Sequence, residues 1–327
     1  MLKKILSLAV SASILFGITG CSLVRQDMTD VVHETEVPPD MVFLGDSIAA
    51  GYGLDGYTST DNYSCPDSYA NTLKARYTEE LDGLCIHNMQ NFAVSGATSS
   101  DLLELLNSGT IDDALADSDA VVVSIGGNDL LHIMFNMLGN FGVTAENHTI
   151  NISEFDLFGA AASLLSMDSD IDEALAGFEI NLQKISAVLN EKTDGRIYIQ
   201  TLYNPLETFS DVQAIVDFSD SKLDRFNEII KTGSAEYTVI DVAAEFEGRC
   251  SELTRISELD IHPNEKGHAE IAGIIDSVFR ADGFSCIVQE YGEPYLPLST
   301  IFLILGGFCA MLVVVILVIP KLFKKYE

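Results

Sequence analysis

The sequence predicts an α/β protein in which a parallel sheet lies between two layers of helices. Short, continuous apolar runs recur along the chain, as expected of parallel strands that are buried on both faces. Amphipathic helical patterns separate these runs, and strands that alternate with helices indicate a three-layer α/β sheet. Such sheets bind ligands beyond the carboxyl ends of their strands, so residues that follow an apolar run are the first candidates for a site.

Five segments are the expected strands. The first reads Met-Val-Phe-Leu-Gly over residues 41–45 and carries no polar side chain. Similar runs occupy residues 120–125, 197–201 and 237–242, and a weaker one occupies residues 84–93. Their lengths are typical of buried strands.

Two segments are the clearest helices. The first has apolar residues at steps of four and three, which places them on one helix face: Ile171, Leu175, Phe178, Leu182, Ile185 and Leu189. The second carries Ile271, Ile275 and Val278 and follows Asn264, a residue type that caps helix N-termini.

The first 21 residues predict a lipoprotein-type signal peptide. Lys3 and Lys4 precede an apolar run that ends with small residues directly before Cys21. This ending resembles a bacterial lipobox, which implies cleavage before Cys21 and a lipid on its sulfur. The alternative is an uncleaved anchor helix with a chance cysteine.

A transmembrane helix is expected over residues 301–319, because 19 residues without a charge cross most of a bilayer at about 1.5 Å per residue. A buried core helix is the alternative. The basic tail at 320–327 is expected in the cytoplasm by the positive-inside rule. The intervening chain is then extracytoplasmic, at the cell membrane. We expect it to comprise a tether (22–40), one domain (41–282) and a linker (283–300).

The chain is strongly acidic, with a formal net charge of −31. The expected outer part, residues 22–299, holds 13 of the 18 Lys and Arg residues and 48 of the 49 Asp and Glu residues. Such a surface repels polyanions, so nucleic acid is excluded as a partner and neutral substrates are favoured.

Four cysteines remain once Cys21 is assigned to a lipid and Cys309 to the membrane helix: Cys65, Cys85, Cys250 and Cys286. In an oxidising compartment they suggest two disulfides. Of the three possible connectivities we favour the two local pairs, Cys65–Cys85 and Cys250–Cys286, because each closes a short loop. The sequence contains no C-x-x-C spacing, and it calls for no metal ion and no cofactor.

Four polar motifs are candidates for chemistry. Three follow strands and the fourth precedes the last helix: Gly45-Asp46-Ser47, residues 91–98 with Gly96, Gly126-Gly127-Asn128-Asp129, and Asp260-Ile261-His262-Pro263-Asn264. Each motif alone is also ordinary turn chemistry. Together they supply a hydroxyl, a base, donors for an oxyanion and a carboxylate to orient the base, which are the parts that nucleophilic catalysis needs.

With these motifs in this order, residues 41–282 resemble the SGNH hydrolases, which are GDSL-type esterases and lipases. The stretch from Phe43 to Gly53 is especially similar to bacterial members. The resemblance implies a flavodoxin-like three-layer α/β/α sandwich with a five-stranded parallel sheet. It also implies hydrolysis of a carboxylic ester through an acyl-enzyme.

The same resemblance implies the roles of individual residues. Ser47 would be the nucleophile and His262 its general base. The backbone N–H groups of Ser47 and Gly96, with the side-chain amide of Asn128, would form the oxyanion hole.

The histidine motif departs from the family pattern. The family's aspartate usually stands three residues before the histidine, where this chain has Leu259. We expect Asp260, two residues before His262, to orient the imidazole. Glu258 or a backbone carbonyl could serve instead, because the role needs only an acceptor for the imidazole N–H.

The expected function is therefore an esterase acting on a small ester, an acylated glycan or a lipid. Alternatives are an acyltransferase that uses the same acyl-enzyme and a surface-binding module that has lost turnover. Between the third motif and the next helix, residues 130–170 form a long excursion rich in Met, Leu and Phe. It is expected either to cap an acyl pocket or to cover an edge of the sheet.

Overall fold

The computed structural model describes residues 27–130, 168–209, 213–233, 235–258, 260–292 and 298–317. The chain divides into two units, one spanning Glu34–Cys286 and the other comprising both ends, Met1–His33 and Ile287–Glu327. The expected signal peptide with Cys21, the basic tail and nearly all of the excursion lie outside the described residues.

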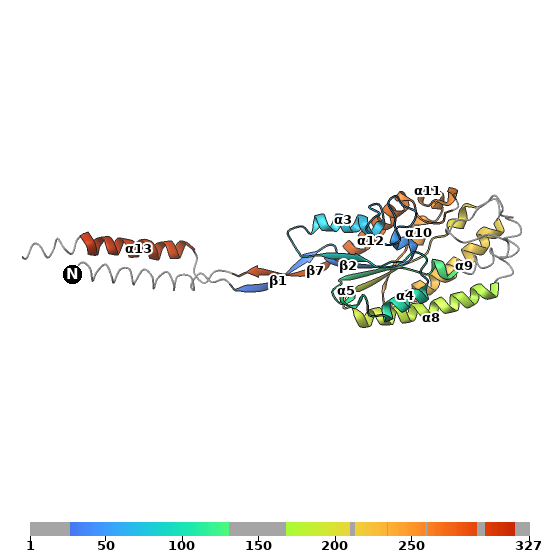
Figure 1. Cartoon of the computed structure of the whole chain (residues 1–327), viewed down its shortest axis with the longest axis horizontal. Helices are drawn as coiled ribbons and strands as arrows, with labels where there is room; N and C mark the ends of the chain where they lie inside the picture. Colours follow the sequence, from blue (N-terminus) through green and yellow to red (C-terminus); the bar gives the residue numbers. More distant parts are fainter. Residues whose placement is uncertain are drawn as a thin grey trace, which may run out of the picture. The chain divides into compact units, whose positions relative to one another are not determined.

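The larger unit contains a five-stranded sheet in which all strands are parallel (Figure 1). Its strand order is β3-β2-β4-β5-β6, which is the flavodoxin-like order. The predicted fold class is confirmed, and each expected strand is present: β2 (Asp40–Gly45), β3 (Asn88–Asn91), β4 (Ala120–Ser124), β5 (Arg196–Gln200) and β6 (Thr238–Ile240).

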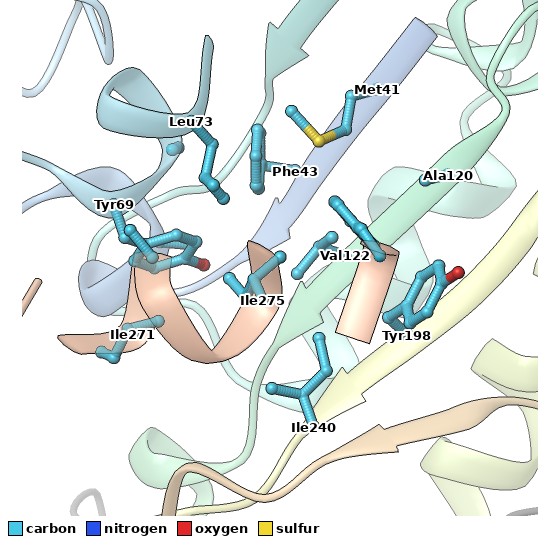
Figure 2. Packing of buried hydrophobic residues seen from close by; sticks show 14 of the residues in the cluster. Met41, Phe43, Tyr69, Leu73, Ala120, Val122, Tyr198, Ile240, Ile271 and Ile275 are labelled. Atoms are coloured by element: carbon cyan, nitrogen blue, oxygen red, sulfur yellow. The ribbon is translucent and has the colours of Figure 1, made fainter. Parts of the chain in front are cut away.

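Side chains of each strand alternate between two cores. Met41 and Phe43 of β2 pack on one face with Tyr69, as Figure 2 shows, whereas Val42 and Leu44 pack on the other. This alternation explains why the runs are apolar throughout, because both faces of each central strand are buried.

Helices cover both faces of the sheet (Figure 1). The first face is covered by α2 (Ser47–Ala50), α3 (Tyr69–Glu80), α10 (Val242–Phe246), α11 (Cys250–Leu253) and α12 (Glu265–Asp282). The second is covered by α4 (Ser99–Asn107), α5 (Asp112–Ala116), α8 (Asp168–Lys192) and α9 (Gln213–Thr232). Both predicted helices are present, as α8 and α12. Asn264 caps α12, since its side chain accepts from the Gly267 N–H at 3.0 Å.

A second, two-stranded sheet pairs β1 (Met28–Thr35) with β7 (Phe284–Tyr291). These strands fall largely in the segments that the sequence suggested as tether and linker. The terminal helix α13 (Leu298–Leu317) contains an 18-residue window, Thr300–Leu317, with a mean hydropathy of 2.9. By length and composition it could cross a membrane.

The favoured disulfide pairing is wrong. Cys85 is bonded to Cys286, 201 residues along the chain, while Cys65 and Cys250 are buried free thiols. The Cys65 thiol contacts the Gly51 carbonyl and the Cys250 thiol contacts the Phe246 carbonyl. Loop length did not predict the disulfide connectivity, because the fold determines which cysteines lie close together.

Candidate active site

Ser47 lies at the carboxyl end of the inner strand β2, where it begins helix α2. The turn depends on Gly45, which has a φ of 135° and leaves no room for a side chain. A Cβ atom there would lie 1.9 Å from the Ser124 carbonyl oxygen of β4. The following N–H, of Asp46, donates to that same oxygen at 3.0 Å. The neighbouring strand therefore fixes the position of the serine.

The structure brings Ser47, His262 and Asp260 together. Ser47 Oγ lies 2.8 Å from His262 Nε2, and His262 Nδ1 lies 2.5 Å from Asp260 Oδ1. The three residues are 7 %, 4 % and 6 % exposed. The imidazole thus lies between a hydroxyl and a carboxylate, and the ring of Tyr52 packs on it with 4.6 Å between centroids.

Backbone bonds hold the loop that carries the histidine. The Arg255 N–H donates to the His262 carbonyl at 2.9 Å, and the Asp260 N–H donates to the Arg255 carbonyl at 3.3 Å. The His262 N–H donates to Asp260 Oδ1 at 3.0 Å, so one carboxylate oxygen accepts from both the backbone and the ring. The Asp-x-His spacing of this loop therefore still places a carboxylate against the imidazole.

The structure places Asp260, and not Glu258, beside the histidine. The Glu258 side chain is 67 % exposed and pairs with Arg255 at 3.0 Å. Arg255 also lies 3.5 Å from Asp260 Oδ2 and donates to the Gly53 carbonyl. Burial raises the pKa of Asp260, but the bonds from His262 and the charge of Arg255 outweigh burial and hold it below its ordinary value. The carboxylate thus stays ionised at neutral pH.

Asp46, which precedes Ser47, caps helix α2 and takes no part in the contacts of the imidazole described above. Its side chain accepts from the Ile48 N–H at 3.0 Å. Burial raises the pKa of Asp46 to about 7; the bond from Ile48 opposes this shift, and the charge of Asp129 adds to it. The residue before the nucleophile is therefore a titratable group in the neutral pH range.

Replacing Asp46 with Asn should change the pH dependence of stability. A raised folded-state pKa favours folding at low pH, and this contribution falls as the pH rises from about 4 to about 7. Asn keeps an acceptor for the Ile48 N–H and does not ionise. We expect the free energy of unfolding of Asp46→Asn to exceed that of wild type by on the order of 4 kcal/mol at pH 8, and by less at pH 5. Thermal unfolding midpoints at both pH values test this, and an equal difference at both would contradict it.

Besides the N–H of Ser47, the expected oxyanion donors come from the loops after β3 and β4, the two strands that flank β2. The Val94 N–H donates to the Gly45 carbonyl at 2.9 Å, which anchors the second motif beside the serine turn. Gly96 then adopts a φ of 86°, in the left-handed region that glycine tolerates. Asn128 is buried, and one of its amide hydrogens is donated to the Ala97 carbonyl at 2.9 Å. An amide carries two hydrogens, so one remains for a ligand.

Several residues of the site were not singled out from the sequence. Arg255 precedes the histidine motif in the same loop, and Tyr52 lies in the stretch from Phe43 to Gly53, but the sequence pattern indicates a role for neither. Asp46 belongs to the recognised serine motif, but its burial becomes visible only in the fold. Among the described residues, no group of three or more His, Cys, Asp or Glu side chains could hold a metal ion.

The parallel sheet and the buried Ser-His-Asp contacts at its carboxyl edge are those of an α/β protein with a hydrolase-type site. The chain belongs to the GDSL-like lipase/acylhydrolase family, whose model matches residues 43–270. The family resemblance recognised in the sequence is thereby confirmed.

Two curated proteins are similar in sequence. The Bacillus subtilis (strain 168) protein YpmR, which is uncharacterized, is 25 % identical over 292 residues, covering 86 % of this chain and 98 % of YpmR. The spore germination lipase LipC of Bacillus licheniformis is 24 % identical over 228 residues, covering 69 % of this chain and 89 % of LipC.

Solved structures show the same fold. The lipase Lip_vut3 from a goat rumen metagenome is 22 % identical, with a TM-score of 0.50 over 73 % of this chain and 96 % of that one. The extracellular lipase of Streptomyces rimosus is 17 % identical, with a TM-score of 0.51 over 73 % of this chain and 98 % of that one.

Proposed function

We propose that the protein is a membrane-anchored, extracytoplasmic serine esterase that hydrolyses carboxylic esters through an acyl-enzyme. The observation that carries this proposal is the buried chain of contacts from Ser47 Oγ through the imidazole of His262 to Asp260. Family membership supports it, because the family consists of lipase-like and acylhydrolase enzymes.

In the proposed first half-reaction, Ser47 Oγ attacks the ester carbonyl while His262 Nε2 takes its proton. The negative charge on the carbonyl oxygen is stabilised by the N–H groups of Ser47 and Gly96 and by the amide of Asn128. Collapse of this intermediate breaks the ester C–O bond, and the imidazolium protonates the departing alcohol. Water then attacks the acyl-serine by the same steps, which releases the acid and restores the hydroxyl.

Ester turnover tests this proposal directly. We expect the full chain, purified in lipid nanodiscs, to hydrolyse p-nitrophenyl acetate and to be labelled covalently by a fluorophosphonate. A protein that does neither would be a binding module. Faster loss of ester in the presence of an added alcohol, with ester exchange in the products, would identify an acyltransferase.

Asn128→Ala should lower kcat by on the order of 10²–10³ with little change in KM, because an oxyanion donor acts mainly in the transition state. Kinetics with p-nitrophenyl acetate provide both constants. A large rise in KM at unchanged kcat would instead assign Asn128 to substrate binding.

We propose that both chain ends hold the domain at the outer face of the cell membrane, through a lipid on Cys21 and through α13. Deleting residues 300–327 should then leave the protein membrane-bound, because two acyl chains suffice for stable anchoring. Adding Cys21→Ala to the deletion should block cleavage before this residue, which mass spectrometry would detect as a chain that keeps its first 20 residues. Fractionation of cells into membrane and soluble parts tests the deletion, and release by the deletion alone would show that Cys21 bears no lipid.

A further inference from the structure

A cavity of about 130 Å³ lies beside the catalytic residues. Three of its lining residues are direct chain neighbours of the residues assigned to catalysis. Ile48 follows Ser47, Gly127 precedes Asn128, and Ile261 precedes His262. The cavity therefore borders the loops that carry the proposed nucleophile, an oxyanion donor and the base.

The cavity is lined mainly by apolar side chains. Helix α9 contributes Phe218 and Leu223, and the segment after β5 contributes Leu202 and Leu206. A largely apolar lining favours a hydrocarbon chain over a sugar, because a sugar's hydroxyl groups would lose their hydrogen bonds with water without replacement.

Among the described lining residues the one charged side chain, Lys222, is ion-paired with a carboxylate that Arg225 shares. Lys222 is 7 % exposed, and its ammonium lies 3.2 Å from Asp172 Oδ1. The neighbouring Ser219 hydroxyl donates to the Val216 carbonyl and accepts from the Asn204 amide. These bonds engage the Lys222 ammonium and the Ser219 hydroxyl, which are the polar groups that α9 presents among the described lining residues.

We infer that this cavity receives the acyl chain of the substrate and selects esters of medium-length acids, with an optimum near six carbons. The inference rests on the proposed esterase function. The size follows from volume, since an apolar protein cavity of about 150 Å³ accommodates benzene, which has six carbons. Each methylene that enters should raise kcat/KM about fourfold, so a hexanoyl ester should exceed an acetyl ester by on the order of 100-fold.

The test is the chain-length profile of kcat/KM for p-nitrophenyl esters from two to ten carbons, measured on the full chain in nanodiscs. Leu223 is the residue to vary, because it lines the cavity without belonging to the catalytic groups. Leu223→Trp should fill the cavity, lower kcat/KM for the hexanoyl ester at least tenfold and leave the acetyl ester within about threefold. Leu223→Ala should enlarge the cavity and move the optimum to longer chains.

Ile229 provides a matched control. It lies on the same helix and is also half-buried, but it lines a separate hollow between α8 and α9. Ile229→Trp and Ile229→Ala should leave the chain-length profile unchanged. A shift at Ile229 equal to that at Leu223 would mean that the effect comes from helix packing and would overturn the inference.

The profile separates this inference from the proposed function. Acetyl ester turnover with a flat profile, or one that Leu223 variants do not move, would refute the acyl cavity and leave the esterase intact. Absence of turnover with every ester, acetyl included, would refute the esterase itself and the cavity's assignment with it.

Discussion

Ser47→Ala is expected to lose ester turnover by a factor on the order of 10⁶, the loss that follows removal of a serine nucleophile in serine proteases. Ser47 Oγ is the hydroxyl that lies against Nε2 of the buried imidazole, so its loss removes the group that would carry the acyl chain. The fold should be retained, because Ala fits a helix start and the cap is supplied by Asp46.

The measurement combines kcat/KM with covalent fluorophosphonate labelling. Ser95→Ala is a suitable control, since this serine is half-buried in the neighbouring motif and belongs to no proposed step. We expect Ser95→Ala to keep both activity and labelling. Labelling that persists in Ser47→Ala would place the nucleophile at another residue.

Asp260→Asn is expected to lower kcat/KM by on the order of 10⁴, as it does where a carboxylate fixes the tautomer of a catalytic histidine. The carboxylate accepts a hydrogen bond from Nδ1–H, which leaves Nε2 bare toward Ser47, and it stabilises the imidazolium that forms during attack. An amide could present its NH₂ group to Nδ1 and favour the wrong tautomer. His262→Ala should lose at least as much activity.

Glu258→Gln is the matched control for this change. It alters a carboxylate in the same loop whose side chain is exposed and paired with Arg255. We expect its kcat/KM to stay within a few-fold of wild type. A severe loss in Glu258→Gln with a nearly silent Asp260→Asn would assign the orienting role to Glu258. Mild effects in both, with His262→Ala severe, would point to a backbone carbonyl.

The sheet was predictable because its strands are buried on both faces. The run at residues 41–45 shows this directly, since alternate side chains enter the two cores and none is polar. Strand β3 was the weakest prediction, and its four residues read Asn-Met-Gln-Asn. It lies at the edge of the sheet, where burial is incomplete and the apolar signal is correspondingly poor.

The serine and histidine motifs were also predictable, because both stand at element boundaries that the pattern marks. Contacts between segments that are distant in the sequence were not predictable. The Cys85–Cys286 bond and the contact of Arg255 with the Gly53 carbonyl depend on which loops meet in space, which local sequence does not encode. Strands β1 and β7 were not predicted from the sequence. Each is largely exposed and lacks the apolar signal of a core strand.

The pairing of β1 with β7 has a consequence for the order of folding. A two-stranded ribbon is at best marginally stable alone, and joining segments on either side of Glu34–Cys286 closes a very long loop at an entropic cost. Once the intervening chain has folded around the five-stranded sheet, it has lost most of its conformational entropy, so pairing β1 with β7 costs less. We therefore expect the ribbon to form last and fray first, so that its amides exchange with solvent hydrogen faster than those of β2 and β4.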